Sequence, residues 1–326
     1  MPKEIAHISI ARSVAGKLPD QSLFSRAISG YPNLFRYGAV APDTFYYYLL
    51  GPDLRSTQKL SKPFHTSDSS CLDPVFNLLN INGHDKDKTL AFTGGLLCHM
   101  ATDTVFHPMI YYFCGHDDLH VGATVRHRAF ETALDFYFIT DSVRQEKTDL
   151  NRIMIQLEIS PTELVDLFER LFSLEKDRQR LSIKLAVKEY LLANQILKNR
   201  LIYKIIKPLH RYGLGIPGSI EALFYPSARP FRLSFFQNTL YYRDTKTGKP
   251  LTTTMDRLVK NTVQQTVHLL GKLESAIKSD QKRAEIRSDP AWSFFRPDLS
   301  KQSFRFWYNR PGLRRMLTKE ITRSNR

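Results

Sequence analysis

The sequence has few cysteines and no long uninterrupted hydrophobic run. Its cysteines are Cys71, Cys98 and Cys114, which are unevenly spaced and form no CxxC pair. This pattern argues against a disulfide framework and a thiolate zinc knuckle, and it favours a reducing compartment. No stretch reaches the roughly 18 apolar residues that a membrane-spanning helix needs, and the N-terminus lacks the pattern of a signal peptide. We therefore expect a soluble, cytoplasmic protein that is at most peripheral to a membrane.

Acidic residues are scarce in the second part of the chain. Residues 1–140 hold 12 Lys+Arg and 13 Asp+Glu, whereas residues 141–326 hold 35 and 19, so the net charge of +15 comes from the C-terminal part. Such asymmetry suggests a polyanionic partner, either nucleic acid or an anionic membrane surface, although many basic proteins have only a solvated positive face. We expect a domain over residues 1–200 and a basic, aromatic-rich, mostly helical extension over residues 201–326.

The hydrophobic periodicity is helical almost throughout, and it predicts an all-α fold. Helices are expected over residues 3–18, from Asp87 as N-cap to His107, and over 124–138, 161–174, 178–207 and 252–279. Pro108 is expected to end the second of these helices. Residues 30–75 contain repeated glycine and proline, which predicts a long irregular segment.

Two local signals refine this outline. Gly94 and Gly95 lie inside a predicted helix, which indicates close approach of another backbone or a ligand. Ser160-Pro-Thr-Glu163 has the pattern of a capping box with proline at the first helical position.

The chain end from residue 291 interleaves aromatic residues with arginines. This mixture suits a lipid headgroup boundary, single-stranded nucleic acid or docking on the protein's own core.

The most informative feature is a set of histidines and carboxylates at helical spacing. His99, Asp103 and His107 are four residues apart, so a helix would present all three on one side. His127 and Glu131 repeat this spacing on the next predicted helix. Mixed imidazole and carboxylate sets are typical of catalytic zinc sites, and two facing helices could hold more than one ion.

Further candidates lie outside these two helices. Asp43 in Ala-Pro-Asp and His65 in Phe-His-Thr belong to the irregular segment, and both could reach the metal cluster. His7 lies beside the apolar stripe of the first predicted helix. Asp135 either orients a histidine or faces solvent.

Taken in order, His7, the Asp43 loop, His65, the glycine-rich helix with its three candidate ligands, and the His127 pair resemble the zinc-dependent phospholipase C family. The resemblance covers about residues 5–140 and implies an all-α core with a zinc cluster. It implies that His65, His99 and Asp103 hold one zinc ion, with Asp43 as a further ligand or as the base that orients water. It assigns His107, His127 and Glu131 to a second ion. For a third ion it offers only His7 and a bridging Asp103.

The implied reaction is hydrolysis of a phospholipid or related phosphodiester by metal-activated water. The basic, aromatic chain end would then bring the protein to an anionic membrane surface. Two alternatives stay open: a non-catalytic, metal-stabilised protein whose basic half binds membrane or nucleic acid, and a zinc-dependent nuclease. Survival of Asp43 and of an open zinc position separates the enzyme from the non-catalytic protein.

Overall fold

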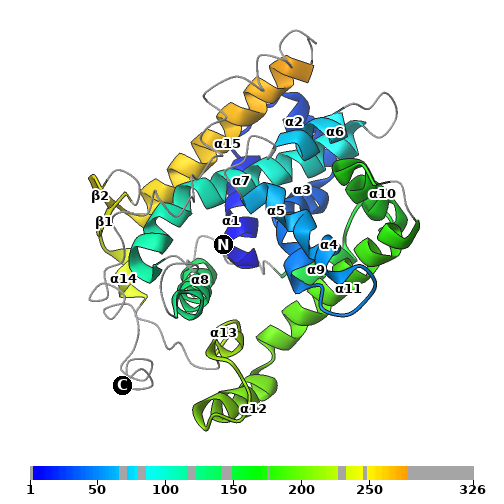
Figure 1. Ribbon diagram of the computed structural model, residues 1–326. Coiled ribbons are helices and arrows are strands. Elements are labelled where there is room, and N and C mark those ends of the chain that lie inside the picture. The colour runs from blue at the N-terminus through cyan, green and yellow to red at the C-terminus, as the bar shows by residue number, and fades with distance from the viewer. Residues whose placement is uncertain are drawn as a thin grey trace.

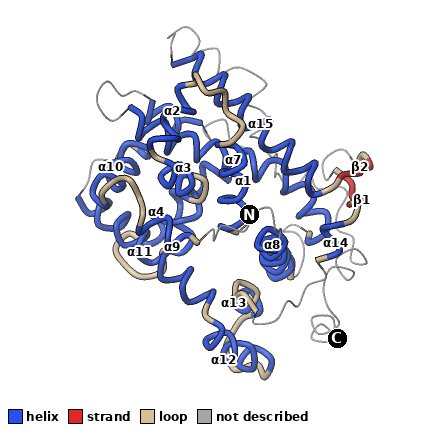
Figure 2. Tube along the Cα trace, turned by 180° about the vertical axis from the view of Figure 1, so that it is seen from behind, coloured by secondary structure: helices blue, strands red, loops and turns tan. Residues whose placement is uncertain are grey.

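The protein is all-α. The computed structural model describes residues 3–65, 72–79, 86–115, 122–140, 149–174, 177–226, 233–244 and 248–277. The regular elements of these residues are helices apart from one short hairpin (Figures 1 and 2), which confirms the predicted fold class. None of the helices in the described ranges is both long and apolar enough to cross a membrane. The aromatic and basic chain end from residue 291 lies outside the described residues.

The first 80 residues form short helices. Their bounds are α1 Glu4–Ala15, α2 Leu23–Gly30, α3 Pro32–Gly38, the 3₁₀ helix η1 Ala41–Tyr47, α4 Leu54–Gln58, the 3₁₀ helix η2 Lys59–Ser61, α5 Lys62–His65 and α6 Asp73–Leu79. The prediction of an irregular segment over residues 30–75 was therefore wrong. Pro32 and Pro42 lie in the first turns of α3 and η1, where a missing N–H costs no hydrogen bond, so they start helices as well as interrupt them.

Helix α7, Lys86–Cys114, runs through the middle of the molecule and packs against α1, α2, α3, α8 and α15 (Figure 1). It continues past Pro108, so the prediction that this proline ends the helix was wrong. Phe106, Met109 and Ile110 are buried on both sides of the proline. Their packing outweighs the roughly 3 kcal/mol that an interior proline costs. Asp87 lies in the first turn and pairs with Arg26 at 3.1 Å, so it is not the N-cap.

The glycines of α7 differ in their surroundings. A Cβ on Gly95 would lie 2.3 Å from Phe35 O and 2.6 Å from the Cα of Gly38, whereas a Cβ on Gly94 would make ordinary contacts of 3.4 Å or more. The predicted close backbone approach is confirmed at Gly95. It brings the end of α3, and with it the following η1, directly onto α7.

The later elements complete the fold. They are α8 Ala123–Thr140, α9 Leu150–Ile155, α10 Pro161–Phe172, α11 Asp177–Lys198, α12 Arg200–Arg211, α13 Gly218–Glu221, α14 Ser234–Gln237, β1 Leu240–Arg243, β2 Pro250–Thr253 and α15 Met255–Ile277. The strands pair antiparallel, with Leu240 opposite Thr253.

Two predictions for these later helices had different outcomes. The capping box of Ser160 and Glu163 is formed at the start of α10, as predicted. The single helix predicted over residues 178–207 is instead two helices, because Asn199 caps the N-terminus of α12 with its side chain.

One hydrophobic core connects both ends of the described chain. Helix α15 buries Met255, Val259, Val263, Leu270 and Leu273. It packs against α7 and α1. The residues of α15 join the same core cluster as those of α1. The division into a domain over residues 1–200 and an extension from residue 201 stays a prediction.

Candidate metal centre

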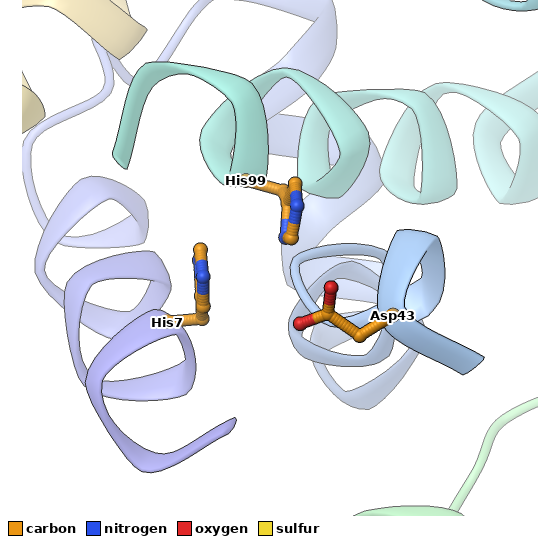
Figure 3. A group of neighbouring side chains, drawn as sticks. All are labelled: His7, Asp43 and His99. Atoms are coloured by element: carbon orange, nitrogen blue, oxygen red, sulfur yellow. The ribbon is translucent and has the colours of Figure 1, made fainter. Parts of the chain in front are cut away.

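The structure brings together all eight side chains that the sequence predicted as metal ligands. They come from α1 (His7), η1 (Asp43), α5 (His65), α7 (His99, Asp103, His107) and α8 (His127, Glu131). Seven of them are buried and His65 is partly exposed. They form three groups whose nitrogen and oxygen atoms lie within 4.8 Å of one another: His7, Asp43 and His99; His65, His99 and Asp103; and His107, His127 and Glu131. Figure 3 shows the first group, with His7 and Asp43 pointing toward His99 from two other elements.

Two histidines of this centre have a fixed tautomer. His99 Nδ1 lies 3.0 Å from Ala39 O, and His65 Nδ1 lies 2.8 Å from Ser61 O. A carbonyl oxygen only accepts, so each Nδ1 carries the proton and each neutral ring has a lone pair on Nε2. Because Ala39 directly follows Gly38, the close approach of α3 to α7 also places this carbonyl.

The two Nε2 atoms of His65 and His99 face each other at 3.1 Å. With both Nδ1 atoms protonated, this contact sets one lone pair against another. It is stable only with a cation or a proton between the rings. The donor geometry therefore fits a shared metal ion.

Distances to the carboxylates agree with this reading. His65 Nε2 lies 3.3 Å from Asp43 Oδ1, and His99 Nε2 lies 3.3 Å from Asp103 Oδ2. His7 Nε2 lies 3.4 Å from the other Asp103 oxygen, Oδ1. These separations exceed a normal hydrogen bond. They match the distance of about 3.3–3.6 Å between neighbouring ligand atoms of a tetrahedral zinc ion with bonds of about 2.0–2.2 Å.

Buried polar atoms without a hydrogen-bond partner point the same way. Among the described residues these include both ring nitrogens of His7 and of His107, Oδ1 of Asp43 and both carboxylate oxygens of Asp103. Leaving such groups unsatisfied in a protein interior is costly, whereas coordination to a cation would satisfy one nitrogen of each ring together with the carboxylate oxygens. The residues present thus fit a zinc-binding centre.

The acidic members of the centre are held ionised. Burial alone would raise the pKa of Asp103, but the neighbouring His99 and His107 hold that pKa well below its ordinary value. Burial likewise opposes ionisation of Asp43, yet His99 and His65 lower its pKa. Both carboxylates are therefore available as anionic ligands, or in the case of Asp43 as a base, at neutral pH.

The third group lies one turn further along α7. His127 Nε2 is 2.8 Å from Glu131 Oε1 on the same helix, and the ring centroids of His107 and His127 are 5.9 Å apart. Burial lowers the pKa of His107 to about 3 and brings the pKa of His127 well below its usual value. Both rings are thus neutral at physiological pH, which is the form that binds a metal ion.

Asp135 has neither of the two roles that the sequence offered. It is fully buried, and its carboxylate accepts hydrogen bonds from the backbone of Ile5 at 3.3 Å and Ala6 at 2.9 Å, as well as from the hydroxyl of Tyr225. These backbone groups belong to the first turn of α1. Asp135 thus caps α1 from another helix and fixes the turn that carries His7.

Sequence reasoning missed two aromatic neighbours of the centre. The Tyr46 ring lies 5.1 Å from His65, and the Tyr111 ring lies 5.0 Å from His107 and 5.4 Å from His127. Tyr111 follows His107 by four residues, so the helical spacing that identified the ligands also carried the signal for this neighbour. Tyr46 had no such signal, because its position depends on the fold of η1.

Comparison with known proteins places this centre in a family. The sequence model of the family described as zinc dependent phospholipase C matches residues 6–180, which is more than half of the 326 residues and a range that contains the eight predicted ligands. No curated protein and no solved structure matches the chain. The chain belongs to the zinc-dependent phospholipase C family.

Proposed function

We propose that the protein is a zinc-dependent phosphoesterase that hydrolyses a phospholipid or a related phosphodiester. The observation that carries this proposal is the buried cluster of imidazoles and carboxylates, in which the Nε2 atoms of His65 and His99 face each other at 3.1 Å. The family match over residues 6–180 supports it. Two zinc ions are proposed, one at His65, His99 and Asp103 and one at His107, His127 and Glu131. His7, with Asp103, would contribute to a third.

The chain's own groups have distinct parts in this reaction. Zinc, when bound, would supply a Lewis acid for the phosphate and lower the pKa of a bound water. Asp43 would accept the proton of the attacking water, because its carboxylate is ionised at neutral pH and Oδ1 lacks a hydrogen-bond partner among the described residues. Asp103 would neutralise positive charge between His7 on one side and His99 on the other. Ala39 and Ser61 would keep two rings in the tautomer that leaves Nε2 free.

Metal content measured beside hydrolysis tests the proposal. Elemental analysis of protein grown in replete zinc should give at least two ions per chain. The protein should hydrolyse a member of a panel that holds short-chain phospholipids, soluble phosphodiesters and single-stranded nucleic acids. Hydrolysis of nucleic acid alone would replace the proposal with the nuclease. Bound metal without hydrolysis of any member would favour the non-catalytic alternative, and less than one ion per chain would remove the metal centre itself.

Asp43→Asn tests the base. The amide keeps the shape of the side chain but takes no proton, so hydrolysis should fall by at least about 100-fold while most of the metal stays bound. The matched control is Asp256→Asn, at an exposed carboxylate in the first turn of α15. Loss of the metal together with activity would make Asp43 a simple ligand, and unchanged turnover would exclude both roles.

We also propose that the basic, aromatic chain end from residue 291 binds an anionic membrane surface. A cytoplasmic location is likewise a proposal. Deletion of residues 291–326 should weaken binding to anionic vesicles while hydrolysis of a soluble phosphodiester persists, because all proposed ligands precede residue 132. Unfolding of the truncated chain would instead indicate that these aromatic side chains pack on the protein's own core.

A further inference from the structure

Helix α12 is the least covered long element of the described chain. None of the residues in Arg200–Arg211 is buried. The helix projects from the rest of the molecule beyond α11, together with the short α13 (Figures 1 and 2). It nevertheless carries large apolar side chains: Leu201 is 69% exposed, Ile205 is 61% exposed and Tyr212, directly after the helix, is 73% exposed. Apolar side chains this exposed on a projecting helix indicate a site that binds another molecule or a membrane.

The exposed apolar residues form one stripe. Leu201, Ile205, Pro208 and Tyr212 are spaced by four, three and four residues, which places them along one side of a helix. Leu192 and Ile196 are exposed on the preceding helix α11 and are also four residues apart. Both α11 and α12 therefore carry exposed apolar side chains.

A second stripe of cations lies beside the first. Arg200, Lys204, Lys207 and Arg211 have the same spacing, and each directly precedes one residue of the apolar stripe. All four are exposed, and the helix contains no Asp or Glu. A helix with adjacent apolar and basic stripes and no acidic residue matches the helices that lie in the plane of a membrane interface.

This combination favours a lipid surface over other polyanions. A nucleic acid would neutralise the cations but leave Leu201 and Ile205 in water. An anionic bilayer provides a partner for each stripe, because acyl chains contact the apolar stripe and phosphates contact the cations. A partly inserted helix meets both along its whole length, because the two stripes run parallel.

Helix α12 is connected to the rest of the protein near the candidate metal centre. His210 near the end of α12 donates from Nδ1 to Ile216 O at 2.9 Å, which closes the turn back to α13. A Cβ on Gly218 would lie 3.1 Å from His210 and 3.7 Å from Val125, which precedes His127 by two residues on α8. Arg128 also donates to Ser219 O at 2.7 Å. The base of the projecting unit therefore packs on the helix that carries two proposed ligands.

We propose that α12 docks the protein on an anionic phospholipid surface, with its apolar stripe inserted among the acyl chains and its basic stripe against the phosphates. The choice of lipid agrees with the proposed phospholipid substrate but concerns adsorption, not hydrolysis. Docking through α12 holds α8 and its ligands at the membrane. It also assigns surface binding to a helix that is distinct from the chain end beyond residue 291.

Sedimentation of the full chain with vesicles tests the basic stripe. The vesicles are phosphatidylcholine with and without phosphatidylserine, at low and high salt. Lys204→Gln with Lys207→Gln should weaken binding to the anionic vesicles by about 30-fold, since each cation near such a surface contributes about a fivefold effect. The matched control, Arg257→Gln with Lys260→Gln, removes two exposed cations from α15 and should change binding by less than about twofold.

The apolar stripe is tested in the same assay. Leu201→Gln with Ile205→Gln should weaken binding by at least about tenfold, because two side chains no longer leave water. Its control is Tyr241→Gln in the hairpin, where the side chain is 68% exposed. Circular dichroism of each variant should equal that of the wild type.

Three results would overturn the proposal. The first is that the wild-type protein does not bind anionic vesicles. The second is that the α12 variants bind these vesicles as well as the wild type does. The third is that the α12 variants lose binding to a single-stranded oligonucleotide but retain binding to vesicles. Since the bound fraction of protein is measured and does not depend on hydrolysis, an inactive wild type would count against the proposed function alone.

Discussion

Helices α7 and α12 use the same residue spacing for opposite purposes. In α7 nearly every turn is buried, and the four-residue repeat of His99, Asp103 and His107 meets side chains from α1, η1, α5 and α8. In α12 no residue is buried, and the repeat of cations and apolar side chains faces outward. Regular spacing alone therefore identifies a helix side but not what that side contacts.

The difference explains where chemistry and docking can take place. Metal ligands need fixed rings and low-dielectric surroundings, which α7 has because its neighbours approach to backbone contact at Gly95. A docking helix needs exposed apolar area, which only a helix outside the core can offer. Substitutions should accordingly be costly around α7 and nearly neutral for stability on α12.

The largest effect is expected for Gly95→Ala. The new methyl group would lie less than 3.0 Å from Phe35 O and from the Gly38 backbone. Backbone atoms cannot move aside as a flexible side chain can, so the unfolding free energy should fall by about 3 kcal/mol. Gly94→Ala is the matched control and should be near neutral, because its contacts are ordinary and alanine favours the helix. Chemical denaturation of both variants measures the difference. Equal stability of the two variants would mean that α3 and α7 can separate without cost.

Asp135→Ala should have the next largest effect. It leaves the first-turn N–H groups of α1 without their buried acceptor, so the unfolding free energy should fall by about 2 kcal/mol. Tyr225→Phe removes the hydroxyl that donates to this carboxylate and to Glu4, and it should cost about 1 kcal/mol. If Asp135→Ala were no more harmful than Tyr225→Phe in thermal unfolding, the capping role would be wrong.

Glu163 gives a smaller, pH-dependent effect. Hydrogen bonds from Lys88 and the Ser160 backbone lower the pKa of Glu163 from 4.5 to about 2. Since the pKa is lower in the folded state, the stabilisation is complete above pH 4.5 and is lost as the pH falls toward 2. The side chain is 42% exposed, which screens the ion pair.

Glu163→Gln should therefore cost only about 0.5–1 kcal/mol at neutral pH. Urea unfolding of wild type and variant from pH 7 to pH 2 should show the two curves converging at the acid end. A constant difference over that range would contradict the ionised cap.

The smallest effect is expected on α12. Leu201→Gln with Ile205→Gln should change the unfolding free energy by less than about 0.5 kcal/mol, because both side chains are exposed. The same pair of residues is expected to matter strongly for vesicle binding. A large loss of stability would show that the stripe packs against the protein, so that α12 would be a buried helix like α7.

The local chemistry of the site could be predicted from the sequence. The four-residue spacings on α7 and α8 depend only on helix geometry, and His127 does lie 2.8 Å from Glu131. The capping box of Ser160 and Glu163 is equally local and is formed as predicted. Such patterns survive folding because their partners are a few residues away in the chain.

Other features required the tertiary structure. Helix α7 passes through Pro108 because core packing on both sides compensates for the lost hydrogen bond, and no local rule contains that packing. Asp135 caps α1 across 129 residues of sequence. The opposed Nε2 atoms of His65 and His99 depend on carbonyls placed by two other segments.

Helices α15 and α12 give the clearest division between the two sources of information. Both show apolar residues at helical spacing, and from this spacing the sequence predicted helix for α15 and for residues 200–207 of α12, the latter merged with α11 into one helix. Only the fold decided that Val259 and Val263 are buried on a helix that packs on α7 and α1, while Leu201 and Ile205 are exposed. The physical reason is that burial depends on which distant segments pack over a stripe. Hydrophobic attraction is non-directional and does not specify those segments.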